Sequence, residues 1–518
     1  MKNRLIEYSY VPLILSLIIS FIAAMTHEPW IDEIYAWQIS KFTFLDIFYE
    51  MRYEGHFALW SILLSPFSHS GLPLRTMGLI SWTINAFTMI YFFKKAPFNV
   101  LVKNLVLFSV PFIYLNPSIS RCYVLIPLFL FPMASLFSQM KSLMKNPEKE
   151  TNAFVVSGIL LALFTNTHVY SEGFALIYGI MMLYFTIKAW KHSSKSNKIN
   201  CSVGLLIGML GAFIALIQVI PSITYSSVFT NKESQFVLSD IKKIFEFLTG
   251  SGITGKKSIV FVAVIFVSIS YFLLKKDFFS FLFLLVSNLY MAMICVFIYG
   301  AAVQNRAVMW FYFVIYSLWI TTEKLHQQEC KQHEIKVFAD TKIIYGKQGI
   351  LAVPSILLAV LTLFLLQPSK NFFDFSNLYS GESRFAYFIK DTVSQTEVLF
   401  CNPNSWNCAV MEYIPDYQFY NIKDGKALIP RADRVGLDDE QAEQYIYDIF
   451  RNNPDKNCVY IIDSDIYHHK TNFFERCQLP FEYETLYPQT EEQKEYFIQY
   501  FLIRVSRPDI DWNANQSN

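Results

Sequence analysis

The chain has 518 residues, of which 53% are hydrophobic, 17% aromatic and only 16% charged. Its 49 Phe and 31 Tyr residues are far more than a soluble domain carries, so this composition argues against a soluble protein. The net charge of +1 at pH 7 argues against a nucleic-acid partner.

The N-terminus has the charge pattern of a targeting segment. Lys2 and Arg4 precede an apolar run at residues 11–25, as in a signal peptide. Because many further apolar runs follow, we expect an uncleaved signal anchor. Its basic flank predicts a cytoplasmic N-terminus.

Apolar runs of about 15–22 residues recur along the chain between short basic loops, a pattern typical of transmembrane helices. The sequence therefore predicts an α-helical polytopic protein of the plasma (inner) membrane. We place eleven spans near residues 11–26, 76–93, 101–116, 123–139, 153–167, 172–190, 201–221, 257–274, 278–299, 307–321 and 349–366.

A shorter apolar run at residues 56–67 decides the predicted topology. It is too short for an ordinary span, and counting it as one would place most later Lys and Arg residues outside the cytoplasm. We therefore interpret it as an interfacial helix on the extracytoplasmic side. The cytoplasmic basic clusters are then 94–95, 141–149, 188–198, 275–276 and 324–347, whereas the outer loops carry Arg75, Arg121, Lys232, Lys242, Lys243, Lys256, Lys257 and Arg306.

The composition changes near residues 367–368, where the long apolar runs stop and charged residues become frequent. Residues 397–401 and 457–463 read as buried strands, and residues 438–450 read as an amphipathic helix. We expect a transmembrane domain at 1–366, with a first extracytoplasmic loop at 27–75, and a small extracytoplasmic α/β domain at 367–518.

Two patterns in this C-terminal part leave alternatives open. Asp463 and Asp465 with the His468-His469 pair resemble a metal site, but a strand-end turn with solvated polar residues is the favoured interpretation. The four late cysteines form two disulfides in an exported domain, or remain unpaired in its core. They are Cys401, Cys408, Cys458 and Cys477.

An acidic pair, Asp32-Glu33, follows the first span, where charge beside a bilayer is costly unless it has a partner or a function. On an outer membrane face, a carboxylate can act as the base that takes a proton from an attacking hydroxyl or amine. Cations there can stabilise a departing phosphate, and arginine binds phosphate oxygens with two nitrogens. Other ionisable residues predicted at the outer ends of spans are His56, Arg75, Arg121, His168, Glu172 and Arg306.

The motifs that contain these residues resemble those of the GT-C superfamily of integral membrane glycosyltransferases. The resemblance is to its protein O-mannosyltransferase and aminoarabinose transferase branch. The resemblance covers residues 1–366 and depends on the order of six short motifs. Phe57 and Ala58 stand where the family has two prolines. The motifs lie at residues 30–36 (WIDEIYA), 55–60 (GHFALW), 71–75 (GLPLR), 120–123 (SRCY), 167–170 (THVY) and 305–306 (NR).

The resemblance implies that a hexosyl or pentosyl group is transferred from a polyprenyl-phosphate donor by a single, inverting displacement. The acceptor would be a glycan, a lipid or a protein outside the cytoplasm, as in cell-envelope glycan assembly. Asp32 would be the general base and Glu33 would orient the acceptor or bind a cation. Arg75, Arg121 and Arg306 would bind the donor phosphate, and His56, His168 and Glu172 are further candidates for substrate binding.

Each assignment has a structural alternative. The acids can simply favour a helix N-terminus, Arg75 can extend from a span end toward the interface, and His168 with Glu172 can form a hydrogen-bonded pair or bind a cation. Adjacent carboxylates also suit Mg²⁺ or Mn²⁺, so a divalent cation remains one alternative and no cofactor is certain.

The competing function class is a transporter or flippase for a lipid-linked glycan. Transporters commonly place charges near the bilayer midplane, in broken helices of repeated halves. In this chain the ionisable residues cluster at one predicted face and no repeat of the halves is evident. These features favour an enzyme, either the glycosyltransferase or a lipid-modifying transferase with another polyprenyl-linked donor.

Overall fold

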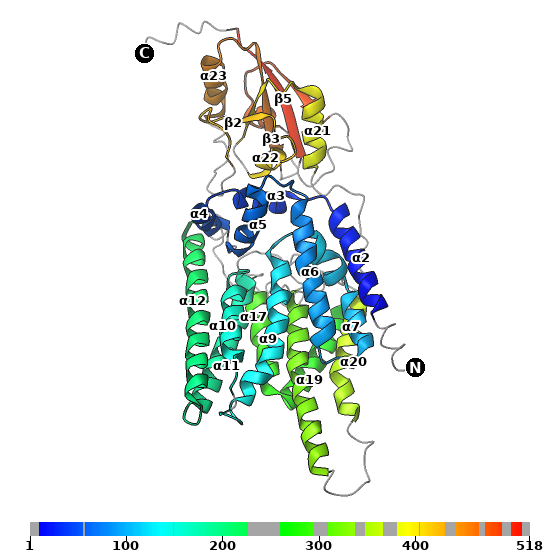
Figure 1. Ribbon diagram of the computed structural model, residues 1–518. Coiled ribbons are helices and arrows are strands. Elements are labelled where there is room, and N and C mark those ends of the chain that lie inside the picture. Colours follow the sequence, from blue (N-terminus) through cyan, green and yellow to red (C-terminus); the bar gives the residue numbers. More distant parts are fainter. Residues whose placement is uncertain are drawn as a thin grey trace. The chain divides into compact units, whose positions relative to one another are not determined.

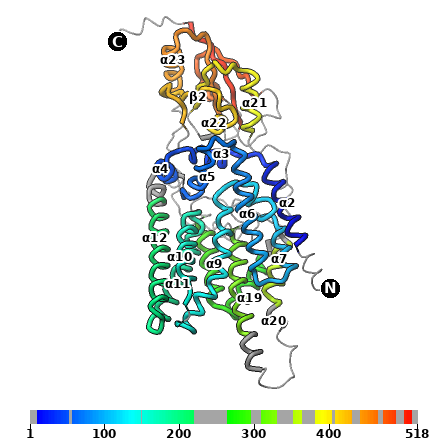
Figure 2. Tube along the Cα trace, in the orientation of Figure 1, coloured from blue at the N-terminus to red at the C-terminus, as the bar shows by residue number. Residues whose placement is uncertain are grey.

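The computed structural model describes residues 10–54, 57–148, 150–225, 259–294, 309–336, 348–365, 381–402, 405–429, 441–465, 472–488 and 499–509. The chain forms two compact units (Figures 1 and 2). The first comprises residues 1–27, 51–60 and 75–375, and the second comprises residues 28–50, 61–74 and 376–518. Parts of the predicted first loop therefore belong to the same unit as the C-terminal sheet.

The first unit is helical. Among the described residues its main helices are α2 (Val11–Thr26), α6 (Thr76–Lys95), α7 (Val100–Leu107), α9 (Leu125–Ser142), α10 (Ala153–Thr165), α11 (Glu172–Trp190), α12 (Lys195–Tyr225), α16 (Ile259–Lys276), α17 (Phe278–Met293), α19 (Met309–Lys336) and α20 (Gln348–Leu365). Each of the eleven predicted spans overlaps one of these helices, because a continuous apolar run favours a buried or membrane-embedded helix. The predicted span at 101–116 is interrupted, since α7 ends at Leu107 and the following segment is bent by 50° relative to it.

The number of membrane crossings is not confirmed. In the described part of the chain, four helices are long and apolar enough to cross a membrane, or up to six if each of two bent helix pairs forms one span. Three shorter apolar helices lie at Ala153–Thr165, Phe278–Met293 and Ala352–Leu363. The predicted orientation of the termini and the predicted boundary at 366/367 remain predictions.

Helix α19 forms the centre of the first unit. Its first three turns are buried on every side, including Trp310 and Tyr312, and the helix packs against α9, α17 and α20. A helix that is apolar around its whole circumference is expected only where neighbours surround it completely. Many of the aromatic side chains that are frequent in the sequence pack around this helix; Phe131, for example, packs against Trp319.

Helices α10 and α12 lie side by side (Figure 2) because small residues line their contact. A Cβ atom added to Gly158 would overlap the backbone of Gly204, and one added to Gly204 would overlap the Phe154 carbonyl. Small residues that allow close backbone approach are characteristic of helix contacts inside membranes, where dispersion replaces the hydrophobic effect.

A polar cluster of Lys141, Asp277 and Lys324 joins three helices. The Asp277 carboxylate is buried and lies 2.8 Å from the Lys324 Nζ atom and 3.5 Å from the Lys141 Nζ atom. Asp277 is the N-cap of α17, Lys324 lies within α19 and Lys141 lies in the last turn of α9, so the cluster fixes these helices relative to one another.

The second unit contains a five-stranded sheet with the order β2-β1-β3-β5-β4 (Figure 1). Strands β1 and β2 are parallel, as are β1 and β3, while β5 runs antiparallel to both β3 and β4. The elements are α21 (Glu382–Thr392), β1 (Val398–Cys401), α22 (Ser405–Val410), β2 (Gln418–Asn421), α23 (Ala442–Asn452), β3 (Cys458–Asp465), α24 (Phe473–Cys477), β4 (Tyr483–Tyr487) and β5 (Gln499–Ser506).

The predicted α/β character of this region is confirmed. The two predicted strands correspond to β1 and β3, and the predicted helix corresponds to α23. Ala442, Ile446 and Ile449 pack from α23 into the core of the sheet. Cys458 has a free thiol, so the four late cysteines do not form two disulfides.

The segment after the first apolar run is more helical than expected. The sequence predicts one helix at residues 56–67, whereas the structure has α3 (Ile31–Ser40), α4 (Phe44–Glu54) and α5 (Leu59–His69). Helix α3 is buried on most of its surface and therefore lacks the alternation of apolar and polar residues that would identify it in the sequence.

Candidate functional site

The acidic pair forms the first turn of α3. Trp30 is the N-cap, and the Glu33 Oε2 atom accepts a hydrogen bond of 3.0 Å from the Trp30 backbone N–H. This interaction is one half of a capping box, in which an N3 glutamate satisfies an exposed donor at the helix start. Both carboxylates also lie in the first helix turn, a position that acidic side chains commonly occupy.

The two acids differ in access. Glu33 is fully buried and engaged with the backbone, whereas Asp32 is half-buried. An incoming substrate can therefore reach Asp32 more readily than Glu33. In the part of the chain that the structure describes, no group of three or more His, Cys, Asp or Glu residues is arranged to hold a metal ion.

The predicted cations of the first unit occupy helix starts and a helix break. Arg75 is exposed and directly precedes α6. Arg121 is only 6% exposed and has extended backbone between the short helix α8 (Asn116–Ser118) and the 3₁₀ turn η2 (Cys122–Val124). His56 and Arg306 lie outside the described residues.

A buried hydrogen-bond network holds the chain just before Arg121. Helix α7 and the segment Pro111–Ser118, which begins with a π-helical turn, are bent by 50° relative to each other. The Asn85 side chain donates to the Phe112 carbonyl at 2.8 Å, and the Tyr312 hydroxyl donates to Asn116 Oδ1 at 2.7 Å. These bonds satisfy polar groups that the break exposes, so the position of Arg121 follows from a defined backbone path.

Two motifs that are distant in the sequence meet beside this break. The His168 ring lies 5.2 Å from the Tyr123 ring and 4.2 Å from the Tyr170 ring, measured between centroids. The His168 Nδ1 atom accepts a hydrogen bond of 3.1 Å from the Tyr170 backbone N–H. In the neutral imidazole the proton is therefore on Nε2.

Glu172 begins α11, four residues after His168. Its Oε1 atom is buried and accepts no hydrogen bond from the residues that the structure describes. The next residue, Gly173, lies so close to Tyr290 of α17 that a Cβ atom on the glycine would stand 2.5 Å from the Tyr290 Cβ atom. The glycine directly after this candidate acid therefore allows α11 and α17 to approach closely.

The fold can be compared with solved structures. The crystal structure of ArnT from Cupriavidus metallidurans in the apo state superposes on 98% of this chain and on 100% of its own, with a TM-score of 0.50 and 10% sequence identity. The chain therefore has the fold of this ArnT structure.

This shared fold confirms the resemblance at the level of architecture. At 10% identity the likeness concerns the fold and carries no information about the chemistry of the site. No protein-family model matches the sequence, and no curated protein matches it.

Proposed function

We propose that this protein is a membrane glycosyltransferase that transfers a sugar from a polyprenyl-phosphate carrier to an acceptor outside the cytoplasm. The observation that carries the proposal is the GT-C fold over nearly the whole chain, combined with an acidic helix start and cations at helix starts and breaks. A transferase of this class needs both kinds of group.

In the proposed reaction, an acceptor hydroxyl or amine attacks the anomeric carbon of the donor sugar. Asp32 takes the proton that the nucleophile loses, while the bond between the anomeric carbon and the phosphate oxygen breaks. Polyprenyl phosphate leaves with the bonding electron pair, and attack opposite the leaving group inverts the anomeric centre.

Arg75, Arg121 and Arg306 are proposed to stabilise the charge that develops on the leaving phosphate. Glu33 is proposed to support Asp32 by fixing the first turn of α3, since its carboxylate caps the helix. His168 and Glu172 are proposed to contact the sugar or the acceptor, and His56 remains a candidate.

The test begins with deletion of the gene, followed by mass analysis of lipid-linked sugars and surface glycans. We expect one glycan mass to disappear and its lipid-linked precursor to accumulate. Wild-type protein restores the glycan, and Asp32→Asn, which keeps size and polarity, does not.

Asp46→Asn is the matched control, because Asp46 is also a first-turn acid, in α4, where it accepts a hydrogen bond from the Thr43 hydroxyl. It should complement fully. Full complementation by Asp32→Asn would exclude Asp32 as the base. A precursor trapped on the cytoplasmic face after deletion would instead indicate a flippase.

A further inference from the structure

Helix α3, which carries the acidic pair, packs against α22 and the turn that follows it (Figure 1). Gln38 of α3 is only 2% exposed, and its Nε2 atom donates a hydrogen bond of 2.6 Å to the Cys408 carbonyl of α22. Within the described residues the Gln38 Oε1 atom accepts no hydrogen bond. The buried Gln38 amide therefore links α3 to α22.

Two further interactions secure the ends of α3. At its C-terminal end, the Lys41 Nζ atom lies 2.6 Å and 2.8 Å from the two carboxylate oxygens of Glu412. At its N-terminal end, the Tyr413 hydroxyl donates to the Pro29 carbonyl at 3.3 Å. We call these three contacts the α3 clamp. They bracket the helix from the residue before its N-cap to the residue after its last turn.

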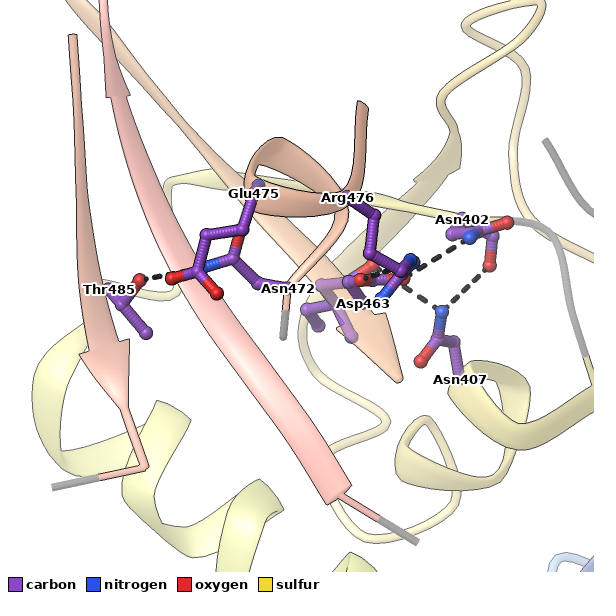
Figure 3. A network of polar contacts seen from close by, with 8 residues as sticks. Asn402, Asn407, Asp463, Asn472, Glu475, Arg476 and Thr485 are labelled. Atoms are coloured by element: carbon purple, nitrogen blue, oxygen red, sulfur yellow. Dashed lines mark hydrogen bonds and ion pairs between the residues drawn. The ribbon is translucent and has the colours of Figure 1, made fainter. Parts of the chain in front are cut away.

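The far side of the clamp is anchored in the sheet. Helix α22 follows strand β1 in the chain, and the Asn407 side chain of α22 donates to the Asn402 carbonyl at 2.9 Å. Asn402 in turn donates to Asp463 Oδ1 at 3.2 Å, and the Arg476 guanidinium lies 3.0 Å from Asp463 Oδ2 (Figure 3). A buried polar network thus fixes α22 at the carboxyl ends of β1 and β3.

A helix of ten residues has little stability of its own, so its orientation depends on what packs against it. The position of a first-turn carboxylate depends on the direction of the whole helix. A general base displaced by about 1 Å can lose about a hundredfold in rate. A change in the α3 clamp is therefore expected to move Asp32 and to lower the rate of the proposed reaction.

We propose that the C-terminal domain orients the acid-bearing helix through the α3 clamp, and that Gln38, Lys41, Glu412 and Tyr413 are positioning residues for Asp32. This inference rests on the proposed function and deepens it. It assigns a task to residues 376–518, for which the sequence indicates none.

The test uses charge reversal in the full-length protein. Lys41→Glu and Glu412→Lys each place like charges together and are expected to lower transfer by about tenfold. The double variant Lys41→Glu/Glu412→Lys restores the opposite charges and should recover most of the activity. Transfer is assayed in membranes, with the lipid extract of the deletion strain as the donor.

The kinetic signature separates positioning from substrate binding. A displaced base lowers kcat, whereas KM for the lipid extract should change by less than about twofold, because uniform substrate binding is unaffected. The matched control is Lys456→Glu. Lys456 forms an ion pair with Glu397 at the same 2.6 Å separation, but at β1 and away from α3. The control should retain activity.

Hydrogen exchange of the amides at residues 31–40 gives a readout that does not depend on activity. We expect faster exchange in Lys41→Glu and in Tyr413→Phe, and unchanged exchange in Lys456→Glu. Unchanged exchange in both clamp variants would overturn the clamp itself, and faster exchange with wild-type kcat would overturn the positioning role. If the wild-type protein transfers no sugar, the proposed function fails, while exchange still decides whether the clamp exists.

Discussion

Asp32 and Glu33 are neighbours in the sequence, yet their side chains have different surroundings. Glu33 is buried and bound to the backbone of Trp30, which is sufficient structural reason for an acid at that position. Asp32 has more access to solvent and lies in the same helix turn. The reading of one acid as the base and the other as its support therefore has a physical basis in burial and helix capping.

Arg121 allows a sharper test of phosphate binding. Arg121→Lys keeps the charge but removes the planar fork that holds two phosphate oxygens. Since a charged hydrogen bond contributes about 1.5–3 kcal/mol, we expect transfer to fall by about 10- to 100-fold in Arg121→Lys and further in Arg121→Gln. Binding of undecaprenyl phosphate, measured by native mass spectrometry, should weaken as transfer falls.

Lys188→Gln serves as the control for that measurement, because Lys188 lies in the last turn of α11, at the opposite end from Glu172. It should bind undecaprenyl phosphate as the wild-type protein does. Wild-type binding and transfer in Arg121→Gln would show that Arg121 has a structural role only.

The close packing of helix α10 against helix α12 depends on small residues at their contact. Gly158→Ala forces a methyl group into the backbone of α12 and should destabilise the protein by about 1–3 kcal/mol through overpacking. Gly179→Ala is the matched control, because its added methyl would only meet Leu161 Cδ2 at 3.8 Å. The thermal midpoint of the detergent-solubilised protein should fall for the first variant alone.

Strand β3 contains a buried carboxylate whose charge affects stability. Burial raises the pKa of Asp463, while the nearby Arg476 guanidinium and the Asn402 amide partly counteract that rise. With a folded-state pKa above its unfolded value of 3.8, this residue stabilises the fold fully below that value and loses the contribution as pH rises through the folded-state pKa.

Arg476→Gln removes the counteracting cation, so the pKa of Asp463 should rise further. The loss of folding stability caused by the substitution should then grow with pH. We expect the free energy of unfolding to fall by about 1–3 kcal/mol at neutral pH, because the buried Asp463 carboxylate loses its charged hydrogen-bond donor. The decrease should be smaller near about pH 4. Hydrogen exchange of Cys458–Asp465 measures this effect. Arg504→Gln breaks an exposed ion pair with Glu484 and should cost less than about 1 kcal/mol at either pH.

At the scale of the whole molecule, the distribution of Lys and Arg predicts the topology. Alkaline phosphatase fused after residue 509 should be active, and fused within residues 143–148 it should be inactive, because basic loops remain in the cytoplasm. The reverse pattern would invert the predicted sidedness. It would also move Asp32 to the cytoplasmic face and remove the proposed extracytoplasmic reaction.

The sequence by itself determined the apolar helical character of the first unit, the approximate positions of its helices and the α/β character of the C-terminal part. These properties follow from local composition and periodicity, which each segment carries regardless of its neighbours. The acid pair, Arg75 and Arg121 were recognisable as candidates for the same reason, since a charge at the end of an apolar run is costly wherever the chain later folds.

Only the tertiary structure decided which distant segments share one unit. It brought His168 against Tyr123, placed Gly173 against Tyr290, and joined α3 to α22 through Gln38 and Lys41. Such contacts depend on side-chain packing between segments up to 371 residues apart, and no local pattern records them. The acidic pair indicated a helix start only as an alternative, and the extent of helix α3 was not predicted, because burial on most faces removed the periodicity by which a surface helix is recognised.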